Sequence, residues 1–426
     1  SVAVLPDTTT PSFERGTAWT TALFGTASAG SGAPTRLGAS SATGDASSEA
    51  ATEGGASPSA LDASAIDGPD EAPLVDEAGD VAPTPACPGA QRMCAGQCTA
   101  IATDANNCGA CGQSCAPGTC SGGTCQPWVV TASYSSSFGC DGTDVAWAQP
   151  TIIDVLEAPA DGSGAHSGSW LRISRSSGNG DVYGVSMMSG VTAWTVTDPG
   201  GNGNALIAAI RPGAPGNVIQ AGFGAPTGIA LDSGGGYAYF GTVSGSSADI
   251  WQCSLVAASP PCVSLASFTS SRLGSVAVDD QFVYWTDPGN GLVSRKALAE
   301  GNVTTLASGQ GALGAIVVDD SSIYWTATEP SKTVVRLMSK GSSGSAVVVS
   351  NPGGISALAT DGSKLFFATA DGVIQSLPAT GAQVVTLYSI AGAVSGYPPV
   401  SNLVFAGGSL FWNDQVHSQI AGLRLP

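Results

Sequence analysis

Histidine, basic residues and long apolar runs are all scarce in this chain of 426 residues. It has only two histidines, His166 and His417, which excludes a metal centre built from several histidines. Fourteen Lys and Arg residues against 32 Asp and Glu give a formal charge of −18. Nucleic acids and anionic membranes are bound by clustered cations, so we expect neither as a partner. No apolar run approaches the ~20 residues of a membrane-spanning helix, so we predict no transmembrane segment.

The N-terminal stretch has few branched or aromatic side chains. Residues 1–86 are mostly Ala, Ser, Gly, Thr and Pro, with Asp and Glu gathered towards the end. Such a low-complexity segment buries too little apolar surface to offset the entropy of ordering, so we predict a disordered acidic spacer. It either holds the rest of the chain away from a cell surface or is a simple tail. No signal segment is visible from Ser1, so we expect one to have been removed or to be missing.

Cysteine is concentrated in residues 87–125, where Gly, Ser, Thr, Pro and Asn fill most of the remaining positions. Because this stretch offers no apolar core, we predict a small module held by four disulfides, whose pairing the sequence leaves open. A redox or zinc role for Cys108-Gly-Ala-Cys111 lacks the second Cys-x-x-Cys pair. Such crowding indicates an oxidising compartment, and hence an extracellular or cell-surface location. The cysteines are Cys87, Cys94, Cys98, Cys108, Cys111, Cys115, Cys120 and Cys125.

The run Asn107-Cys108-Gly109-Ala110-Cys111-Gly112 resembles the "NCGxCG" cysteine-rich repeats of surface and secreted proteins of myxobacteria. Those repeats are similar in turn to the plant stigma-specific cysteine-rich family. The resemblance covers about forty residues and implies a bacterial, secreted or cell-surface protein rather than any activity.

From residue 127 to residue 426 the chain repeats an aromatic strand. The intervals between successive final aromatics are 47, 46, 45, 40, 42 and 45 residues. Periods in the forties with several short strands per repeat are typical of an all-β fold, the β-propeller, and no amphipathic helix interrupts the pattern. At one fixed position per repeat, these side chains are expected to pack between neighbouring blades rather than to bind a ligand. They are Trp147, Trp194, Phe240, Trp285, Trp325, Phe367 and Trp412.

The two ends of the repeat region bear on the blade number. The last copy is one strand short, and Trp128-Val129-Val130-Thr131-Ala132 has the composition of the missing outer strand. Pairing these two would close the ring and remove open sheet edges. This predicts seven blades. The first copy contains the long, irregular stretch 150–181, so six blades remain the alternative.

The stretch Tyr284-Trp285-Thr286-Asp287 resembles the signature of the YWTD propellers of the low-density-lipoprotein receptor family, and the Gly-x-x-Val-Asp turns resemble NHL repeats. YWTD propellers have six blades, which conflicts with a count of seven. The resemblance implies a propeller fold and, by analogy, an extracellular binding role.

Few residues suggest chemistry. Cys253 and Cys262 flank a Pro-Pro hairpin and are predicted to form a disulfide, which leaves Cys140 as a buried free thiol. His417 and His166 lie in loops of the last and first copies and, if those loops share a face, could form a catalytic or metal-binding pair. Asp279, Asp319 and Asp361 recur after the innermost strand, where they either cap turns or ring a cation. Turn capping fits their spacing better.

These observations favour a non-catalytic extracellular binding module, in which a propeller displayed on a spacer binds a protein or carbohydrate. We expect no cofactor, no catalytic residue and no metal site. One alternative is a propeller enzyme, a lyase or hydrolase, with a site near His417. Another is a structural surface protein. The sequence leaves the ligand and the oligomeric state open.

Overall fold

A computed structural model describes residues 87–133, 135, 137–148, 155–164, 182–197, 205–210, 217–256, 261–378, 383–393 and 398–426. Every regular element in these ranges is a β-strand. Within the same ranges, no helix combines the length and the apolar character needed to span a bilayer. Both the predicted spacer, residues 1–86, and His166 lie outside the described residues.

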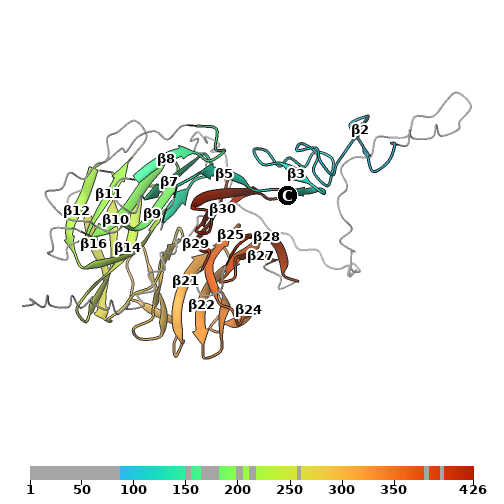
Figure 1. Cartoon of the computed structure of the whole chain (residues 1–426). Coiled ribbons are helices and arrows are strands. Elements are labelled where there is room, and N and C mark those ends of the chain that lie inside the picture. Colours follow the sequence, from blue (N-terminus) through green and yellow to red (C-terminus); the bar gives the residue numbers. More distant parts are fainter. Residues whose placement is uncertain are drawn as a thin grey trace, which may run out of the picture.

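Seven antiparallel sheets follow one another along the chain from residue 128 onward (Figure 1). Each sheet is an up-and-down meander, so its first strand leads directly into a neighbouring second strand. We number the sheets 1 to 7. Sheet 1 contains β6 (Phe138–Cys140), β7 (Asp144–Ala148) and β8 (Val155–Pro159). Sheet 2 contains β9 (Val182–Met188), β10 (Val191–Thr197), β11 (Ala205–Ile210) and β12 (Asn217–Phe223).

The next three sheets have four strands each. Sheet 3 contains β13 (Ala225–Leu231), β14 (Tyr237–Ser244), β15 (Ser247–Ser254) and β16 (Cys262–Thr269). Sheet 4 contains β17 (Val276–Val278), β18 (Phe282–Asp287), β19 (Leu292–Ala297) and β20 (Thr304–Ala307). Sheet 5 contains β21 (Ala312–Val318), β22 (Ser322–Glu329), β23 (Lys332–Ser339) and β24 (Ala346–Asn351).

The last two sheets complete the propeller. Sheet 6 contains β25 (Ile355–Thr360), β26 (Lys364–Thr369), β27 (Val373–Pro378) and β28 (Val385–Ser389). Sheet 7 contains β29 (Val400–Ala406), β30 (Ser409–Asp414), β31 (Gln419–Arg424) and, as its outer strand, β5 (Trp128–Thr131) from the other end of the repeat region. The predicted exchange of an outer strand is therefore present, with Ile420 opposite Thr131 and Gly422 opposite Trp128.

The first strands of the seven sheets contact one another in sequence, and β6 contacts both β9 and β29, so the row of sheets closes on itself. Two glycines explain how tightly the sheets meet at this junction. Gly142 and Gly407 have φ values of 94° and 56°, and a Cβ on Gly142 would lie 2.7 Å from the Gly407 nitrogen. Only glycine tolerates both this conformation and this approach. Asn402 Nδ2 also donates to the Phe138 carbonyl oxygen across the junction, at 2.7 Å.

The blade number differs from the expectation of seven full blades. Six sheets have the four strands of a complete blade, as the six-bladed alternative requires, whereas the described part of sheet 1 has three. Its third strand, β8, lies within the long irregular stretch 150–181, which made the first copy of the repeat hard to recognise in the sequence. The aromatic residue occurs once in every sheet, whether the sheet has three or four strands, so the number of aromatic repeats favoured seven blades.

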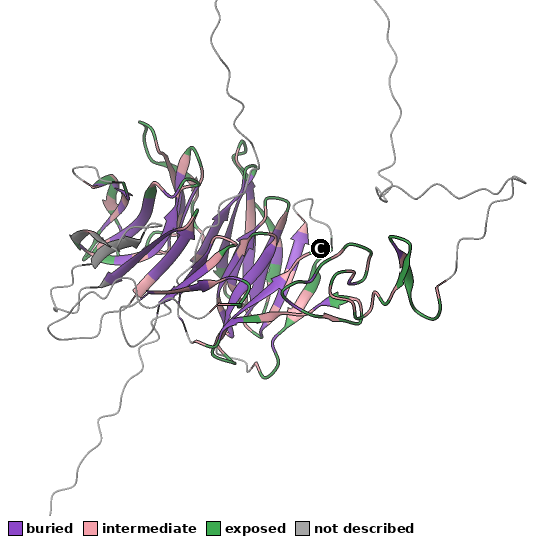
Figure 2. Ribbon diagram, turned by 90° about the horizontal axis from the view of Figure 1, so that it is seen from above, coloured by how far each residue is buried: buried purple, intermediate pink, exposed green. Residues whose placement is uncertain are grey.

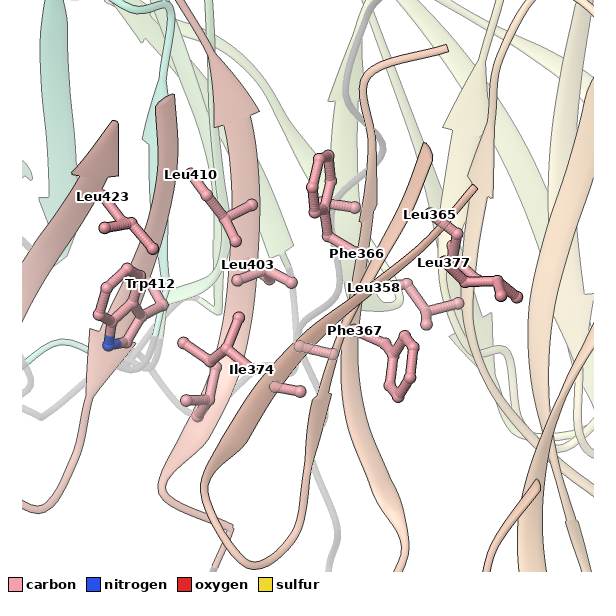
Figure 3. Packing of buried hydrophobic residues seen from close by; sticks show 14 of the residues in the cluster. Leu358, Leu365, Phe366, Phe367, Ile374, Leu377, Leu403, Leu410, Trp412 and Leu423 are labelled. Carbon is pink, nitrogen blue, oxygen red and sulfur yellow. The ribbon is translucent and has the colours of Figure 1, made fainter. Parts of the chain in front are cut away.

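The aromatic residue of each repeat lies in the packing between sheets. All seven are at most 2% exposed. Figure 3 shows one such region, where Phe366 of sheet 6 points towards Leu403 of sheet 7 and Phe367, the next residue of the strand, points to the opposite side of its sheet. Burying side chains of this size stabilises the ring by roughly 2–3 kcal/mol each.

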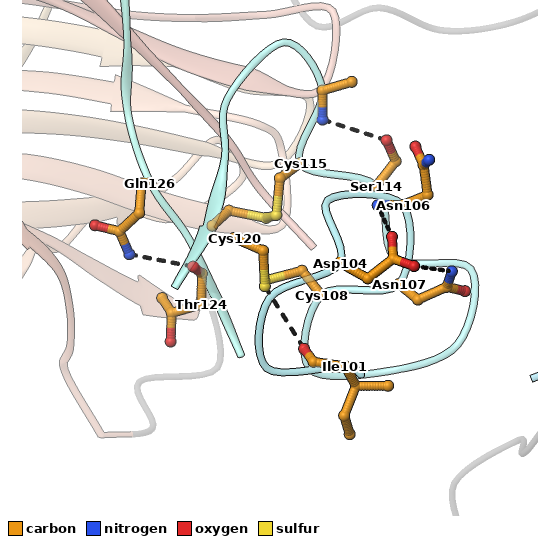
Figure 4. Close-up of a disulfide and its surroundings, with 12 residues drawn as sticks. Ile101, Asp104, Asn106, Asn107, Cys108, Ser114, Cys115, Cys120, Thr124 and Gln126 are labelled. Atoms are coloured by element: carbon orange, nitrogen blue, oxygen red, sulfur yellow. Dashed lines mark hydrogen bonds between the residues drawn. A yellow bond between two sulfur atoms is a disulfide. The ribbon is translucent and has the colours of Figure 1, made fainter. Parts of the chain in front are cut away.

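The cysteine-rich stretch forms a compact module that precedes β5. Its strands are β1 (Arg92–Cys94), β2 (Gln97–Thr99), β3 (Cys120–Ser121) and β4 (Thr124–Cys125). Figure 4 shows that loops fill most of it, with the Asp104 carboxylate accepting from the Asn106 backbone and the Asn107 side chain. Three of its cysteines belong to the same buried cluster as Trp412 and Leu423, so the module packs against the propeller. The disulfides are Cys87–Cys98, Cys94–Cys111, Cys108–Cys120 and Cys115–Cys125.

Candidate functional site

The aspartates that follow the innermost strands cap turns. Asp279 Oδ1 accepts from the backbone nitrogens of Gln281 and Phe282 at 2.8 and 2.7 Å. Asp319 and Asp361 each make the same pair of bonds to the nitrogens two and three residues later. One carboxylate oxygen of each residue is therefore used locally. The hydrogen bonds support turn capping rather than a ring of cation ligands.

Tyr284, the first residue of the Tyr-Trp-Thr-Asp stretch, fixes the second oxygen of Asp279. Its hydroxyl donates to Asp279 Oδ2 at 2.8 Å, and Lys340 of the next sheet places its ammonium 2.6 Å from the same oxygen. Burial alone would raise the pKa of Asp279, but bonds from Lys340, Gln281 and Tyr284 outweigh it and lower the pKa below its ordinary value. Burial and the Asp279 carboxylate raise the pKa of Tyr284.

Trp285 and Thr286 bind neighbouring sheets together. Trp285 stacks on Phe268 of the preceding sheet, with ring centroids 5.8 Å apart. Thr286 is fully buried, and its hydroxyl accepts from the Ser275 nitrogen and donates to the Gly314 carbonyl of the next sheet, both at 2.9 Å. The second and third residues of the signature thus act in packing and in the contacts between sheets.

Asp287, the last residue of the signature, caps the turn between the second and third strands. Its carboxylate is buried and accepts from Ser270 Oγ at 2.6 Å and from both the backbone and the side chain of Asn290. Because Ser270 lies in the connection that leads into sheet 4, the same carboxylate also fixes the entry of the chain into this blade.

His417 occupies the corresponding turn of sheet 7. Its Nδ1 lies 2.7 Å from Oδ2 of Asp414, which is 3% exposed, while the His417 side chain is 45% exposed. The registers Asp414↔Gln419 and Asp287↔Leu292 show that the two turns have the same length. Both have a positive φ one residue before the third strand, 55° at Ser418 and 66° at Gly291.

His417 therefore stands where sheet 4 has Asn290, three residues after a buried aspartate. Asp414 also accepts from the backbone nitrogens of Val416 and His417 at 3.0 Å. The aspartate orients the imidazole and leaves its outer edge in solvent. The predicted pairing of His417 with His166 involves a residue outside the described ranges, and it stays a prediction.

The base of this turn joins sheet 7 to sheet 1. Asn413 Oδ1 accepts from the Ser401 and Asn402 nitrogens at 3.1 and 2.8 Å, and its Nδ2 donates to the Ser135 carbonyl at 3.2 Å. Asn413 thus has the role that Thr286 has in sheet 4. The polar groups beneath His417 are engaged in holding the ring together.

The cysteines offer no reactive thiol or metal ligand in the described ranges. Cys253 lies opposite Cys262 on neighbouring strands, and the two form a disulfide. Cys140 is a free thiol, 4% exposed; burial raises its pKa, and the thiol stays protonated. Cys108, Cys115 and Cys125 have sulfurs within 4.8 Å of one another. All three are oxidised in disulfides, and a metal requires free thiolates.

A surface that the sequence reasoning missed lies at one end of the sheets. Figure 2 shows buried strands with exposed residues gathered at their ends. Of nine exposed large apolar side chains in the described residues, eight lie at the end that carries the connections between strands 1 and 2 and between strands 3 and 4. Only Val416 lies at the other end. We call these eight residues the apolar collar: Val129, Tyr237, Val256, Val263, Val303, Val347, Val384 and Val385.

Most of the collar belongs to the outer strands or the residues that lead into them. The six outer strands in the described ranges, β5, β12, β16, β20, β24 and β28, contain no Asp, Glu, Lys or Arg. Edge strands commonly carry charged side chains, which prevent association with other strands. The absence of charged residues from these six strands was the signal in the sequence that could have revealed the collar. Each of these strands pairs with its neighbour through a register shift, which interrupts the open edge.

Comparisons with known proteins agree with the fold. No protein-family model and no curated protein matches the chain. Among solved structures, a chain of a mitotic checkpoint complex is 13% identical, with a TM-score of 0.52, over 70% of this chain and 93% of that one. A chain of a nidogen/laminin complex is 17% identical, with a TM-score of 0.38, over 49% of this chain and 77% of that one. The likeness to the mitotic checkpoint chain, at this identity, concerns the fold alone. The protein contains a β-propeller, and its five disulfides indicate an oxidising environment.

Proposed function

We propose that this protein is a non-catalytic extracellular binding module whose propeller recognises a protein partner. The apolar collar carries the proposal. Its members recur from sheet 3 to sheet 7, always at the same end, and Val385 is the most exposed at 52%. Single exposed apolar residues are ordinary on protein surfaces, but a set confined to one end of the molecule marks an interaction surface.

The chemistry of the collar favours a protein over a carbohydrate. Sugars are bound by aromatic faces combined with hydrogen-bonding groups, and the collar has one aromatic residue, Tyr237, among seven valines. Register shifts interrupt the outer edges, which disfavours addition of a partner strand. Recognition through valine side chains fits the surface better than recognition through the backbone.

The extracellular location rests on two features. The cysteine-rich module depends on four disulfides, which persist in secreted and surface proteins. It packs against the propeller, so the two form one displayed unit. The acidic stretch 1–86 then acts as the spacer that separates this unit from a surface.

The test is a screen of the full chain against arrays of secreted proteins and of glycans, followed by charge substitution. Val303→Lys, Val347→Lys and Val385→Lys place a cation in three different collar positions, each already exposed, so folding is retained. We expect each to weaken binding of a protein ligand about tenfold or more, because a charge must be desolvated at the interface.

Val416→Lys is the matched control, since Val416 is exposed to 37% at the opposite end. It should bind as the unchanged chain does. Glycan binding alone, or loss of binding in the control with the collar variants unaffected, would contradict the proposal.

A further inference from the structure

The aspartate that caps the turn after the innermost strand lies near the tyrosine five residues later, and we call this pair with its neighbouring side chains the corner of a sheet. The corners of sheets 4 and 5 differ. In sheet 4, Asp279 Oδ2 accepts from the Tyr284 hydroxyl and from the Lys340 ammonium, at 2.8 and 2.6 Å. Lys340 belongs to sheet 5, so the ammonium neutralises the carboxylate and joins the two sheets. This corner has one negative charge, one positive charge and a satisfied hydroxyl.

Sheet 5 repeats the carboxylate and the phenol. Asp319 and Tyr324 have the same spacing as Asp279 and Tyr284, and they are 4% and 1% exposed. Among the described residues, Asp319 Oδ2 has a contact with Thr360 Oγ1 of sheet 6, at 3.5 Å. This hydroxyl already donates to the Lys364 carbonyl at 3.0 Å and accepts from the Gly362 nitrogen. The Tyr324 hydroxyl is buried and makes no hydrogen bond of normal geometry in the same part of the chain, although Asp319 and Ser322 lie close enough to act on its pKa.

No cation of the described residues approaches this carboxylate. Every nitrogen of their Lys, Arg and His side chains lies more than 4.0 Å from Asp319, since the four ion pairs present involve other carboxylates. Burying an ionised carboxylate without a counter-charge is costly. The Asp279 side chain, at 18% exposed, has a counter-charge, whereas the more deeply buried Asp319 has none within the protein.

The Tyr324 hydroxyl stays protonated beside this charge. Burial, reinforced by the Asp319 carboxylate, raises the pKa of Tyr324 to about 12. The Tyr324 side chain therefore adds no negative charge of its own at neutral pH.

We propose that Asp319, Tyr324 and Thr360 bind a monovalent cation of ammonium size, such as potassium or ammonium, in the place that the Lys340 ammonium takes in the preceding sheet. One carboxylate balances one positive charge, whereas divalent ions are held by several carboxylates. The ligands are oxygens, as these cations require: a carboxylate oxygen, a phenol and a hydroxyl. The ion joins sheet 5 to sheet 6, as the lysine joins sheet 4 to sheet 5.

The first test is thermal unfolding of the full chain in potassium, ammonium or tetramethylammonium chloride at equal ionic strength. Tetramethylammonium is too large for the corner and has no N–H group. At a concentration about ten times the dissociation constant, linkage predicts a midpoint about 2–4 °C higher in the two small cations. Equal unfolding midpoints in all three salts would overturn the proposal and would indicate that water, not a cation, occupies the corner.

Matched variants locate the effect. Tyr324→Phe removes only a hydroxyl and should abolish most of the difference between salts, whereas Tyr284→Phe, in the corner that contains a lysine, should leave it unchanged. Lys340→Ala makes the sheet 4 corner resemble the sheet 5 corner and should enlarge the difference. A response that survives in Tyr324→Phe would refute the assignment.

Direct evidence comes from crystals soaked in thallium(I), which substitutes for potassium and scatters anomalously. We expect an anomalous peak between Asp319 Oδ2 and the Tyr324 hydroxyl. Absence of the peak, with an ordered water in its place, would contradict the proposal even if the midpoints differ between salts.

Discussion

Replacement of Thr286 by valine tests whether the third residue of the Tyr-Trp-Thr-Asp stretch acts in stability. Valine keeps nearly the same shape but removes the hydroxyl that bonds to the Ser275 nitrogen and the Gly314 carbonyl, both at 2.9 Å. Thr286 is fully buried, so water cannot replace the lost bonds. A buried polar group that loses its partner costs about 1–3 kcal/mol, and two lost bonds predict a loss of roughly 2–4 kcal/mol.

The assay is equilibrium unfolding of the full chain in urea, with Thr328→Val as the control. Thr328 lies near the end of β22 in the next sheet and is exposed, so its replacement should change the free energy of unfolding by less than about 0.5 kcal/mol. If both variants lie within that margin, the hydroxyl bridge between sheets 4 and 5 does not stabilise the propeller, and the argument for the signature is refuted.

Three further predictions concern other junctions. His417→Asn should change the free energy of unfolding by less than about 0.5 kcal/mol, because Asn290 forms the equivalent bond in sheet 4; a large loss in urea unfolding would contradict that equivalence. Replacing both Cys253 and Cys262 by alanine should cost about 3 kcal/mol in the same assay, from the short loop that their disulfide closes; an unchanged midpoint would contradict it. The pKa of Asp279 is lowered in the folded state, so its contribution is complete above the unfolded pKa of about 3.9 and is lost as pH falls through the folded value. Lys340→Met should therefore destabilise the chain at pH 7 and have a smaller effect at pH 2, and equal effects at both pH values would refute the pairing.

The ring could be predicted because its determinants are local and periodic. An aromatic at a fixed place in each repeat reports a buried position, and the composition of residues 128–132 identified the strand that completes sheet 7. The strand number of sheet 1 could not be predicted, because the irregular stretch after β8 lacks that periodicity. Disulfide pairing was equally inaccessible. The four pairs overlap along the chain, and pairing depends on which Cα atoms approach to between 5.2 and 5.6 Å.

The roles of single polar residues were predicted less well than the fold. Spacing alone indicated that Asp279 caps a turn, because the bonds reach only two and three residues along the chain. The equivalence of His417 and Asn290 needed the strand registers, and the unmatched corner at Asp319 needed side-chain distances across two sheets. The collar appears only when exposure and strand direction are considered together, since a valine that leads into an outer strand looks like any other in the sequence.

Hydrogen–deuterium exchange of the full chain, with and without the first protein ligand found by the array screen, tests the central claim most directly. Recognition through the apolar collar predicts slower exchange of the backbone amides around Val303, Val347 and Val385, with no change in the turn that contains His417. Protection confined to that turn and to the turn at Asn290, with the collar unchanged, would contradict the account and assign recognition to the opposite face.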